Sequence, residues 1–424
     1  MLTTICDRFL LALQYKDYRN LWIANAFAGA ASWALIIARG WLAYDITGGL
    51  LWSGIVTFAA MIPRLFATPL VGFLADRFDR QTLLRWTYTL NFLHNVALAL
   101  LVMQGAISGA GGPWILMALS LLNGTLRTAQ MTTTQSLVPN LVPKEHLMNA
   151  IALNQATQQG SRLVGALTIL PLLSILGTSG VMVAFWLCSG FYAIGLIQVT
   201  RVTTRSTGVI NKDQSFLRNL MEGFVYVYGR PQILAMVLLV LAHCAFTMSY
   251  ESILPGISEE KLGAGSVGVS YLMAAVGGGA LITSVFLAGI QNPKTRGILF
   301  LVFGISSGLG PIIMALSSSS FFSIAAAAAM GVNQAGFMTI SHTIIQSLTD
   351  DSVRGRVSGV YSVHVGGSMA VTNMINAGFA DIFTASSVMA VGGALFVIVI
   401  AFSIGSSALR RIYFPKLSAT PMTA

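Results

Sequence analysis

Long apolar runs separated by short charged or Gly/Pro-rich breaks dominate the chain. A transmembrane helix needs about 20 mostly apolar residues. Twelve runs reach that length; eleven is the alternative count, because the breaks inside 149–199 and 297–343 are short and uncharged. The pattern therefore predicts an all-α integral membrane protein, with spans at 20–44, 52–74, 83–104, 113–133, 149–175, 179–199, 232–255, 267–290, 297–317, 321–343, 357–380 and 385–407.

One long polar segment, residues 200–231, divides the chain near its midpoint. Within it, apolar side chains recur at helical spacing from Phe216 to Tyr228, which is typical of an amphipathic helix on a membrane surface. The simplest function of this helix is to link two halves. We expect six-helix bundles over residues 1–199 and 232–424, joined by 200–231 as a cytoplasmic linker.

A short internal repeat supports this division. Gln135-Ser136-Leu137 follows the fourth predicted span and Gln346-Ser347-Leu348 follows the tenth, an offset of almost half the chain. Both tripeptides precede a polar hinge and then a helix rich in small residues. Parallel six-helix repeats with a substrate site between them, near the middle of the membrane, are a transporter architecture.

The composition excludes several other classes of protein. Only 9% of the 424 residues are charged, whereas soluble domains have about 25%, so a soluble enzyme and a disordered chain are excluded. The isolated residues Cys6, Cys188 and Cys244 form neither a disulfide framework nor a metal motif, and no Walker-type nucleotide-binding stretch occurs. We expect no cofactor and no bound metal.

The distribution of basic residues predicts the orientation. Nineteen of the 24 Lys and Arg residues fall on the side that carries both termini, and Lys261 falls on the other side. By the positive-inside rule, both termini are predicted to be cytoplasmic, in the inner membrane of a bacterium. The net charge of +10 is then explained by the orientation of the chain in the lipid bilayer, and we expect no binding to nucleic acid.

The remaining four arginines, Arg39, Arg64, Arg127 and Arg162, lie inside predicted spans. A charge at bilayer depth costs about 2.5–3.5 kcal/mol on insertion scales and normally faces a partner or a water-filled cavity. Two interpretations stay open: structural ties and gating pairs, or a wall that attracts an anionic substrate. The expected partners are Asp45 for Arg39, and backbone carbonyls or the amides Asn123, Asn154 and Gln158 for Arg127 and Arg162.

Polar groups in the second half could line the opposite wall of a substrate cavity. They are Asn333, Gln334 and Tyr361, with Tyr250, His364 and Asn373. Amides also hold helices together in membranes, so packing is the alternative for each. The predicted cavity set is Arg39, Arg127, Arg162, Asn154, Gln158, Asn333, Gln334 and Tyr361.

Proton coupling needs a group that titrates inside the membrane. Glu251 is the preferred candidate, followed by Asp45 and His243, with His94 and His364 as weaker alternatives. Residues 243 and 251 are about 12 Å apart along a continuous helix, on a shared face. A single histidine in an apolar helix is more often a packing residue.

The loop after the second span contains Gly72 and the stretch Asp76-Arg77-Phe78-Asp79-Arg80. Carboxylates beside arginines form charge-assisted pairs, and Asp79 can cap the next helix; an ordinary basic turn is the alternative. The stretch resembles the Gly-x-x-x-Asp-Arg signature between helices 2 and 3 of the major facilitator superfamily, with Asp79 where a later Gly is usual.

The resemblance continues along nearly the whole chain, toward the exporter branch that includes enterobactin exporters and macrolide-efflux-like permeases. One departure is Ala166 after Gly165, where many antiporters have Gly-Pro in helix 5. Other matching stretches are Tyr18-Arg19-Asn20-Leu21-Trp22, Gly40-Trp41-Leu42-Ala43-Tyr44-Asp45, Arg127-Thr128-Ala129-Gln130, Arg162-Leu163-Val164-Gly165 and Arg354-Gly355-Arg356-Val357.

The resemblance implies two bundles that rock about a central cavity, with Asp76 in a cytoplasmic charge latch near the start of the eleventh span, where the helix dipole favours an anion. We therefore expect a monomeric secondary active transporter, a proton-linked exporter of small organic molecules. The alternatives are export of an anionic metabolite such as a siderophore, transport of a lipid-like amphiphile, and a non-transporting receptor or scaffold. An intramembrane enzyme would need clustered catalytic groups, but the five histidines are scattered.

Overall fold

Helices form all the regular structure in the part of the chain that the computed structural model describes, residues 10–176, 178–206, 216–287, 293–350 and 353–414. The elements are η1 (Leu11–Gln14), α2 (Lys16–Thr47), α3 (Leu50–Met61), α4 (Pro63–Arg77), α5 (Arg80–Met103), α6 (Gly112–Leu137), η2 (Val138–Asn140), α7 (Lys144–Leu176), α8 (Thr178–Thr200), α9 (Phe216–Tyr228), α10 (Pro231–His243), the π-helical η3 (Cys244–Met248), α11 (Leu254–Leu262), α12 (Gly265–Leu287), α13 (Pro293–Leu316), α14 (Ser320–Ser347), α15 (Arg354–Ile382), α16 (Ala385–Gly405) and α17 (Ser407–Tyr413).

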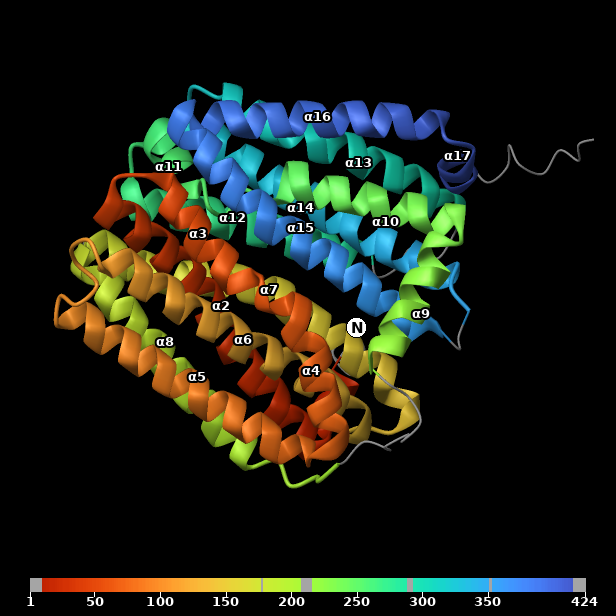
Figure 1. Ribbon diagram of the computed structural model, residues 1–424, viewed down its shortest axis with the longest axis horizontal. Helices are drawn as coiled ribbons and strands as arrows, with labels where there is room; N and C mark the ends of the chain where they lie inside the picture. The colour runs from red at the N-terminus through yellow and green to blue at the C-terminus, as the bar shows by residue number, and fades with distance from the viewer. Residues whose placement is uncertain (1–9, 177, 207–215, 288–292, 351–352, 415–424) are drawn as a thin grey trace, which may run out of the picture.

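The long helices run back and forth between two ends of the molecule. We call one end the basic face; it carries the connections at 77–80, 137–144, 200–206 and 405–407, together with α9 and α17. The other end, the opposite face, carries the connections at 47–50, 103–112, 316–320 and 382–385, together with α11 (Figure 1).

The helices pack in two groups. Helices α2 to α8, the first half, pack on one another, and helices α10 to α17, the second half, do the same (red to yellow and green to blue in Figure 1). Between the halves, α3 packs along α15 and α7 packs along α12. These two helix pairs form the main contact between the two halves.

The outer surface is apolar, as contact with lipid requires. Large side chains such as Ile175, Phe321 and Phe402 are exposed, whereas water-soluble monomers rarely expose broad apolar surface. Among the described residues, ten helical segments are long and apolar enough to cross a membrane. The chain is therefore a multi-pass membrane protein. The predicted spans 113–133 and 357–380 correspond to α6 and α15, which are long enough but more polar than the ten.

Two predicted spans are interrupted. The span predicted at 52–74 divides into α3 and α4 at Pro63, because proline lacks the N–H that would continue the helical hydrogen bonds and is well suited to the first position of a helix. The span predicted at 232–255 was wrong as a continuous helix. It is helical only to His243, π-helical to Met248, and irregular between η3 and α11.

Side chains of the second half satisfy the backbone freed by this second interruption. The Gln334 amide donates to the Thr247 carbonyl (2.7 Å), and the Asn376 amide donates to the Ser249 carbonyl (2.6 Å). The Ser252 N–H donates to Asn373 Oδ1 (3.1 Å). Irregular backbone is tolerated at membrane depth where such buried partners replace water. These amides therefore stabilise the non-helical backbone at residues 249–253.

A helix, α9, lies where the amphipathic linker helix was predicted, and in it Val227 is buried while Met221 and Val225 are exposed. Of the two repeated tripeptides, residues 135–137 are the last three of α6, and residues 346–347 are the last two of α14, with Leu348 directly after it. The internal repeat itself remains a prediction. The linker's contact with lipid remains a prediction.

Close helix packing in the second half depends on glycines of α12 and α14. A Cβ on Gly279 of α12 would overlap the carbonyl of Ala328 on α14, and a Cβ on Gly331 would overlap the carbonyl of Val276. The adjacent Gly278 differs, because a Cβ there would lie 4.0 Å from Leu163, an ordinary contact. The crossing of α12 and α14 therefore has no room for a side chain at Gly279.

We predict that Gly279→Ala destabilises the protein by about 1–3 kcal/mol, the usual cost of overpacking. The matched control is Gly278→Ala, which should be neutral or slightly stabilising because Ala favours the helix. Thermal unfolding of the two purified variants measures the difference. Equal midpoints for the two would contradict the close packing of α12 on α14.

Candidate functional site

Arg162, in the middle of α7, connects the two halves. Its Nη2 donates to Tyr250 Oη at 2.7 Å and lies 3.9 Å from Glu251 Oε1. Its Nε contacts Met273 Sδ at 3.4 Å, and its guanidinium carbon lies 4.7 Å from the ring centroid of Trp33. The buried charge thus has one aromatic partner from the first half and three partners from the second.

The contact continues as a chain of hydrogen bonds into the second half. Tyr250 Oη, which accepts from Arg162, donates to Gln334 Oε1 at 3.3 Å. Gln334 in turn donates to the Thr247 carbonyl. Gln334 therefore hydrogen-bonds both to the interrupted backbone, at Thr247, and to Tyr250, the partner of Arg162. A displacement of Arg162 would therefore disturb the hydrogen bonds at the helix break.

Glu251 is the acidic member of this site. The residue is 6% exposed, and its Oε2 has no hydrogen-bond partner among the described residues. Arg64 and Arg127 act on its carboxylate electrostatically, in addition to Arg162. One buried carboxylate therefore lies in the field of three guanidinium groups, and a change in the position of any of them alters its electrostatic environment.

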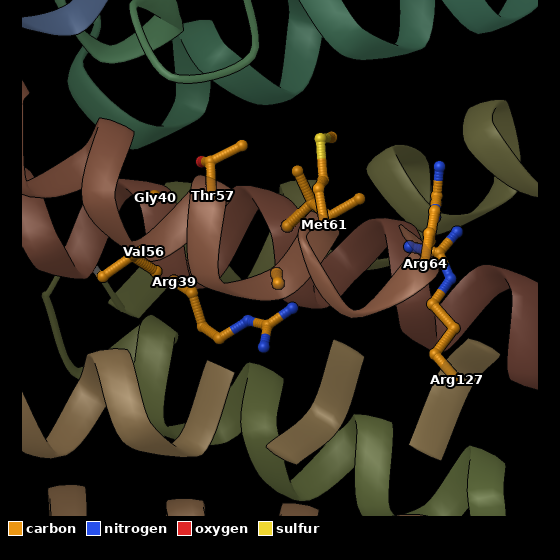
Figure 2. Close-up of a pocket in the computed structure, with 9 residues that line it drawn as sticks. Arg39, Gly40, Val56, Thr57, Met61, Arg64 and Arg127 are labelled. Atoms are coloured by element: carbon orange, nitrogen blue, oxygen red, sulfur yellow. The ribbon is translucent and has the colours of Figure 1, made fainter. Parts of the chain in front are cut away.

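The other three intramembrane arginines line one narrow cavity in the first half (Figure 2). Arg39 Nε donates to the Leu35 carbonyl at 3.2 Å and Nη1 to Ser120 Oγ at 3.5 Å. The predicted pairing of Arg39 with Asp45 is wrong, because Asp45 is exposed at the end of α2 while Arg39 is buried. The cavity is otherwise lined by Ile36, Gly40, Val56, Thr57, Ala60 and Met61.

The amides that were predicted to serve Arg127 and Arg162 do not do so. Asn123 donates to Asn91 Oδ1 at 3.2 Å, Asn154 is half-buried and Gln158 is exposed. Arg127 instead lies 5.7 Å from the Trp33 ring centroid, on which Arg162 also stacks. The partners of Arg162 are instead Trp33 of the first half and Tyr250, Glu251 and Met273 of the second half.

The second-half candidates separate into two sets. Gln334 joins the Arg162 network, and Asn333 is half-buried next to it. Tyr361 is buried on α15, with its Oη 4.0 Å from Met338 Sδ and its ring 5.2 Å from that of His342. Tyr361 therefore packs α15 on α14, and the residues described here do not place it in the arginine site.

The histidines make packing contacts. His243 Nε2 lies 2.7 Å from Ser307 Oγ, and its ring stacks on Phe337. The shared helical face that we predicted for His243 and Glu251 does not exist, because α10 ends at His243. His94 Nε2 lies 2.9 Å from the Leu119 carbonyl, and His364 Nε2 lies 3.0 Å from Tyr228 Oη.

The predicted cytoplasmic motif is held within the first half at Asp79 and Arg80. Asp79 Oδ2 accepts from the Thr82 N–H at 3.0 Å, so its predicted role as the cap of α5 is confirmed. Arg80 Nη1 donates to the Ser136 carbonyl at 2.9 Å and to Asn140 Oδ1 at 3.1 Å. Arg77 is exposed, and the side-chain positions of Gly72 and Asp76 lie outside the described residues.

Burial of Asp79 would raise its pKa, but hydrogen bonds from Thr82 and from the Ser206 N–H outweigh burial and lower it. The stabilising effect of Asp79 is therefore present above its unfolded-state pKa and is lost as the pH falls through its folded-state pKa.

A second link between the halves lies at the opposite face, and sequence reasoning missed it. Asp381, near the end of α15, accepts from the Leu50 N–H at 2.6 Å and from the Leu51 N–H at 2.8 Å. It thereby caps the first turn of α3, where a carboxylate is favoured. The sequence contained one indication of this: α3 begins after Gly49, which has no side chain to cap it.

Comparisons with known proteins place this site in a transporter. The family described as transmembrane secretion effector matches residues 10–420. The chain belongs to this family. It is 24% identical over 358 residues to the uncharacterised MFS-type transporter YvqJ of Bacillus subtilis, covering 83% of each chain.

Two named efflux proteins are similar to this chain along most of their length. Macrolide efflux protein A of Streptococcus pyogenes is 19% identical over 366 residues, covering 86% of this chain and 89% of the relative. The multidrug efflux pump Tap of Mycobacterium tuberculosis is 24% identical over 353 residues, covering 80% of each. The expected resemblance to major facilitator exporters is confirmed.

Solved structures share the fold at low identity. A variant of the nucleoside transporter NupG aligns with a TM-score of 0.73 at 11% identity, over 94% of this chain and 100% of that chain. A POT family transporter in complex with 5-aminolevulinic acid aligns with a TM-score of 0.73 at 10% identity, over 95% and 96%. The chain thus has the fold of these two transporters.

We predict that Tyr250→Phe lowers the stability by about 1–3 kcal/mol, because Arg162 and Gln334 each lose a buried hydrogen-bond partner. Thermal unfolding in detergent measures the effect. The matched control is Tyr271→Phe, since Tyr271 is 43% exposed on α12. If both variants unfold at the wild-type temperature, the Arg162 link contributes nothing to the contact between the halves.

Proposed function

We propose that the protein is a proton-linked exporter of small organic molecules that works by alternating access. The observation that carries the proposal is the Arg162–Glu251–Tyr250 site, in which a titratable carboxylate lies at the contact between the two halves. A group placed there can couple its protonation to the relative position of the halves, because ionised Glu251 attracts Arg162 across the interface and neutral Glu251 does not.

The contacts between the halves support a rocking motion. At the opposite face, Asp381 holds the start of α3, and Gly54 allows close approach of α3 to Ala377. At mid-depth, Arg162 holds Tyr250. We infer that both links are made together in the arrangement observed here and are broken when the opposite face opens.

The proposed topology follows from the same arrangement. Counting α3 with α4, and α10 with η3, twelve long helical segments span the membrane, six in residues 1–199 and six in 232–424, joined by the linker 200–231. The excess of Lys and Arg on the basic face supports a cytoplasmic location for that face and for both termini, in the inner membrane of a bacterium. The proposed working unit is a monomer.

Glu251→Gln tests the coupling. In proteoliposomes with an internal pH dye, the wild-type protein should move protons when a transported compound from a panel of cationic, neutral and anionic organic molecules is supplied, and Glu251→Gln should abolish that proton flux. The variant should still exchange labelled substrate, because exchange needs no net proton movement. Glu259→Gln is the matched control, since Glu259 is an exposed glutamate at the opposite face.

Two outcomes would contradict the proposal. Substrate-driven proton flux that persists in Glu251→Gln would remove Glu251 from the coupling step. Substrate movement by the wild-type protein without any proton flux would remove the proton linkage itself.

Asp76→Asn tests the cytoplasmic latch that the motif implies. We predict a large loss of export with normal insertion into the membrane, because the amide removes the charge that the latch requires. Export assays together with quantification of the membrane-inserted protein measure the two effects separately. Near-normal export by Asp76→Asn would refute the latch.

A further inference from the structure

The structure divides the four intramembrane arginines into two classes. Arg162 and Arg39 have hydrogen-bond partners, from the second half and from α2 and α6 respectively. The guanidinium groups of Arg64 and Arg127 form no hydrogen bond or ion pair with any described residue. The cavity set predicted from the sequence contained Arg39, Arg127 and Arg162 but not Arg64, which lines the same cavity.

Arg64 and Arg127 share one cavity and face the same space. Both line the narrow cavity of the first half, and Figure 2 shows their side chains next to each other. Each lies within range of the other's charge, so they repel each other. Glu251 acts on both from the second half, but its nearest cation is Arg162.

Two guanidinium groups placed this deep in the membrane carry a large free-energy cost. Arg64 is the second residue of α4 and lies 14 residues from Leu50 and 13 from Arg77, at the middle of that span. Two neighbouring cations at this depth normally require a partner or a water-filled space. The described lining of the cavity contains no carboxylate; beside Arg64 and Arg127 it consists of Ile36, Arg39, Gly40, Val56, Thr57, Ala60 and Met61.

We propose that Arg64 and Arg127 form the binding site for the anionic group of the transported molecule, a carboxylate or a phosphate carried on an apolar body. Guanidinium groups bind both anions by charge-assisted hydrogen bonds, and the apolar lining together with the Trp33 ring beside Arg127 suits the rest of the molecule. This inference rests on the proposed transport function and specifies its substrate class. Arg162 remains the link to the second half and Arg39 a structural residue.

The position of Arg64 explains how such a site would respond to transport. Arg64 follows Pro63 at the start of α4, and its Cβ and Cδ lie next to Gly366 of α15 in the second half. A rocking motion that changes the contact of α4 with α15 therefore moves Arg64 relative to Arg127. The anion would be held by both arginines in one arrangement and by fewer contacts in the other.

The test is equilibrium binding without any gradient, so that it does not depend on proton coupling. The probes are 1-naphthylacetate and its uncharged amide, 1-naphthylacetamide, measured by calorimetry on the full-length protein in nanodiscs of zwitterionic lipid. We expect the acid to bind at least about tenfold more tightly than the amide, as the loss of a charge-assisted hydrogen bond implies.

Variants then show which residues cause the preference for the acid over the amide. Arg64→Gln and Arg127→Gln should each reduce the affinity for the acid toward that for the amide and leave binding of the amide unchanged, and Arg127→Lys should restore part of the difference. Competition separates two sources of the anion. Displacement by lysophosphatidylglycerol but not by lysophosphatidylcholine identifies a lipid, and displacement by neither identifies a soluble organic acid.

Equal affinity of the wild-type protein for the acid and the amide would overturn the inference. This comparison needs no variant, so it holds even if a variant fails to fold. An acid preference that survives in both Arg64→Gln and Arg127→Gln would also overturn it. Proton-linked transport of neutral or cationic compounds would still stand in either case, so the two proposals fail separately.

Discussion

The structure depends on how it accommodates charge at bilayer depth. Lipid cannot solvate a guanidinium group, and arginine cannot escape by losing its proton. Each of the four arginines therefore has to face a polar partner, an aromatic ring or a cavity, and all four point into the protein interior or the contact between the halves. The glutamate at that contact is subject to the same constraint, and Arg162 lies within 3.9 Å of it.

This constraint also shapes the backbone around the site. A continuous helix over 232–255 would keep its carbonyls and N–H groups for itself, whereas the interrupted chain presents Tyr250 and Glu251 to Arg162. The interruption is possible because Gln334, Asn373 and Asn376 satisfy the backbone that it frees. The amides of α14 and α15 thus support the site, and Gln334 is joined to Arg162 through the Tyr250 hydroxyl.

The sequence predicted what is local or periodic. Helix positions follow from apolar runs that lipid requires, and the Asp79 cap follows from residues three positions apart. The special status of Glu251 followed from the scarcity of carboxylates within spans. Predictions failed where partners are distant in the chain: Tyr250 lies 88 residues from Arg162, and Asp381 lies 331 residues from Leu50. The predicted shared helix face of His243 and Glu251 failed because helical spacing assumes an unbroken helix, and α10 ends at His243.

We propose that the Arg162 site holds the two halves in the observed arrangement. Distances between spin labels test it most directly, using a Ser108–Ser318 pair at the opposite face and a Gln135–Ser347 pair at the basic face on a cysteine-free background. The double variant Tyr250→Phe, Glu251→Gln removes the hydroxyl and the charge that Arg162 contacts. We predict that it lengthens the first distance and shortens the second. Unchanged distances at both faces would contradict the account.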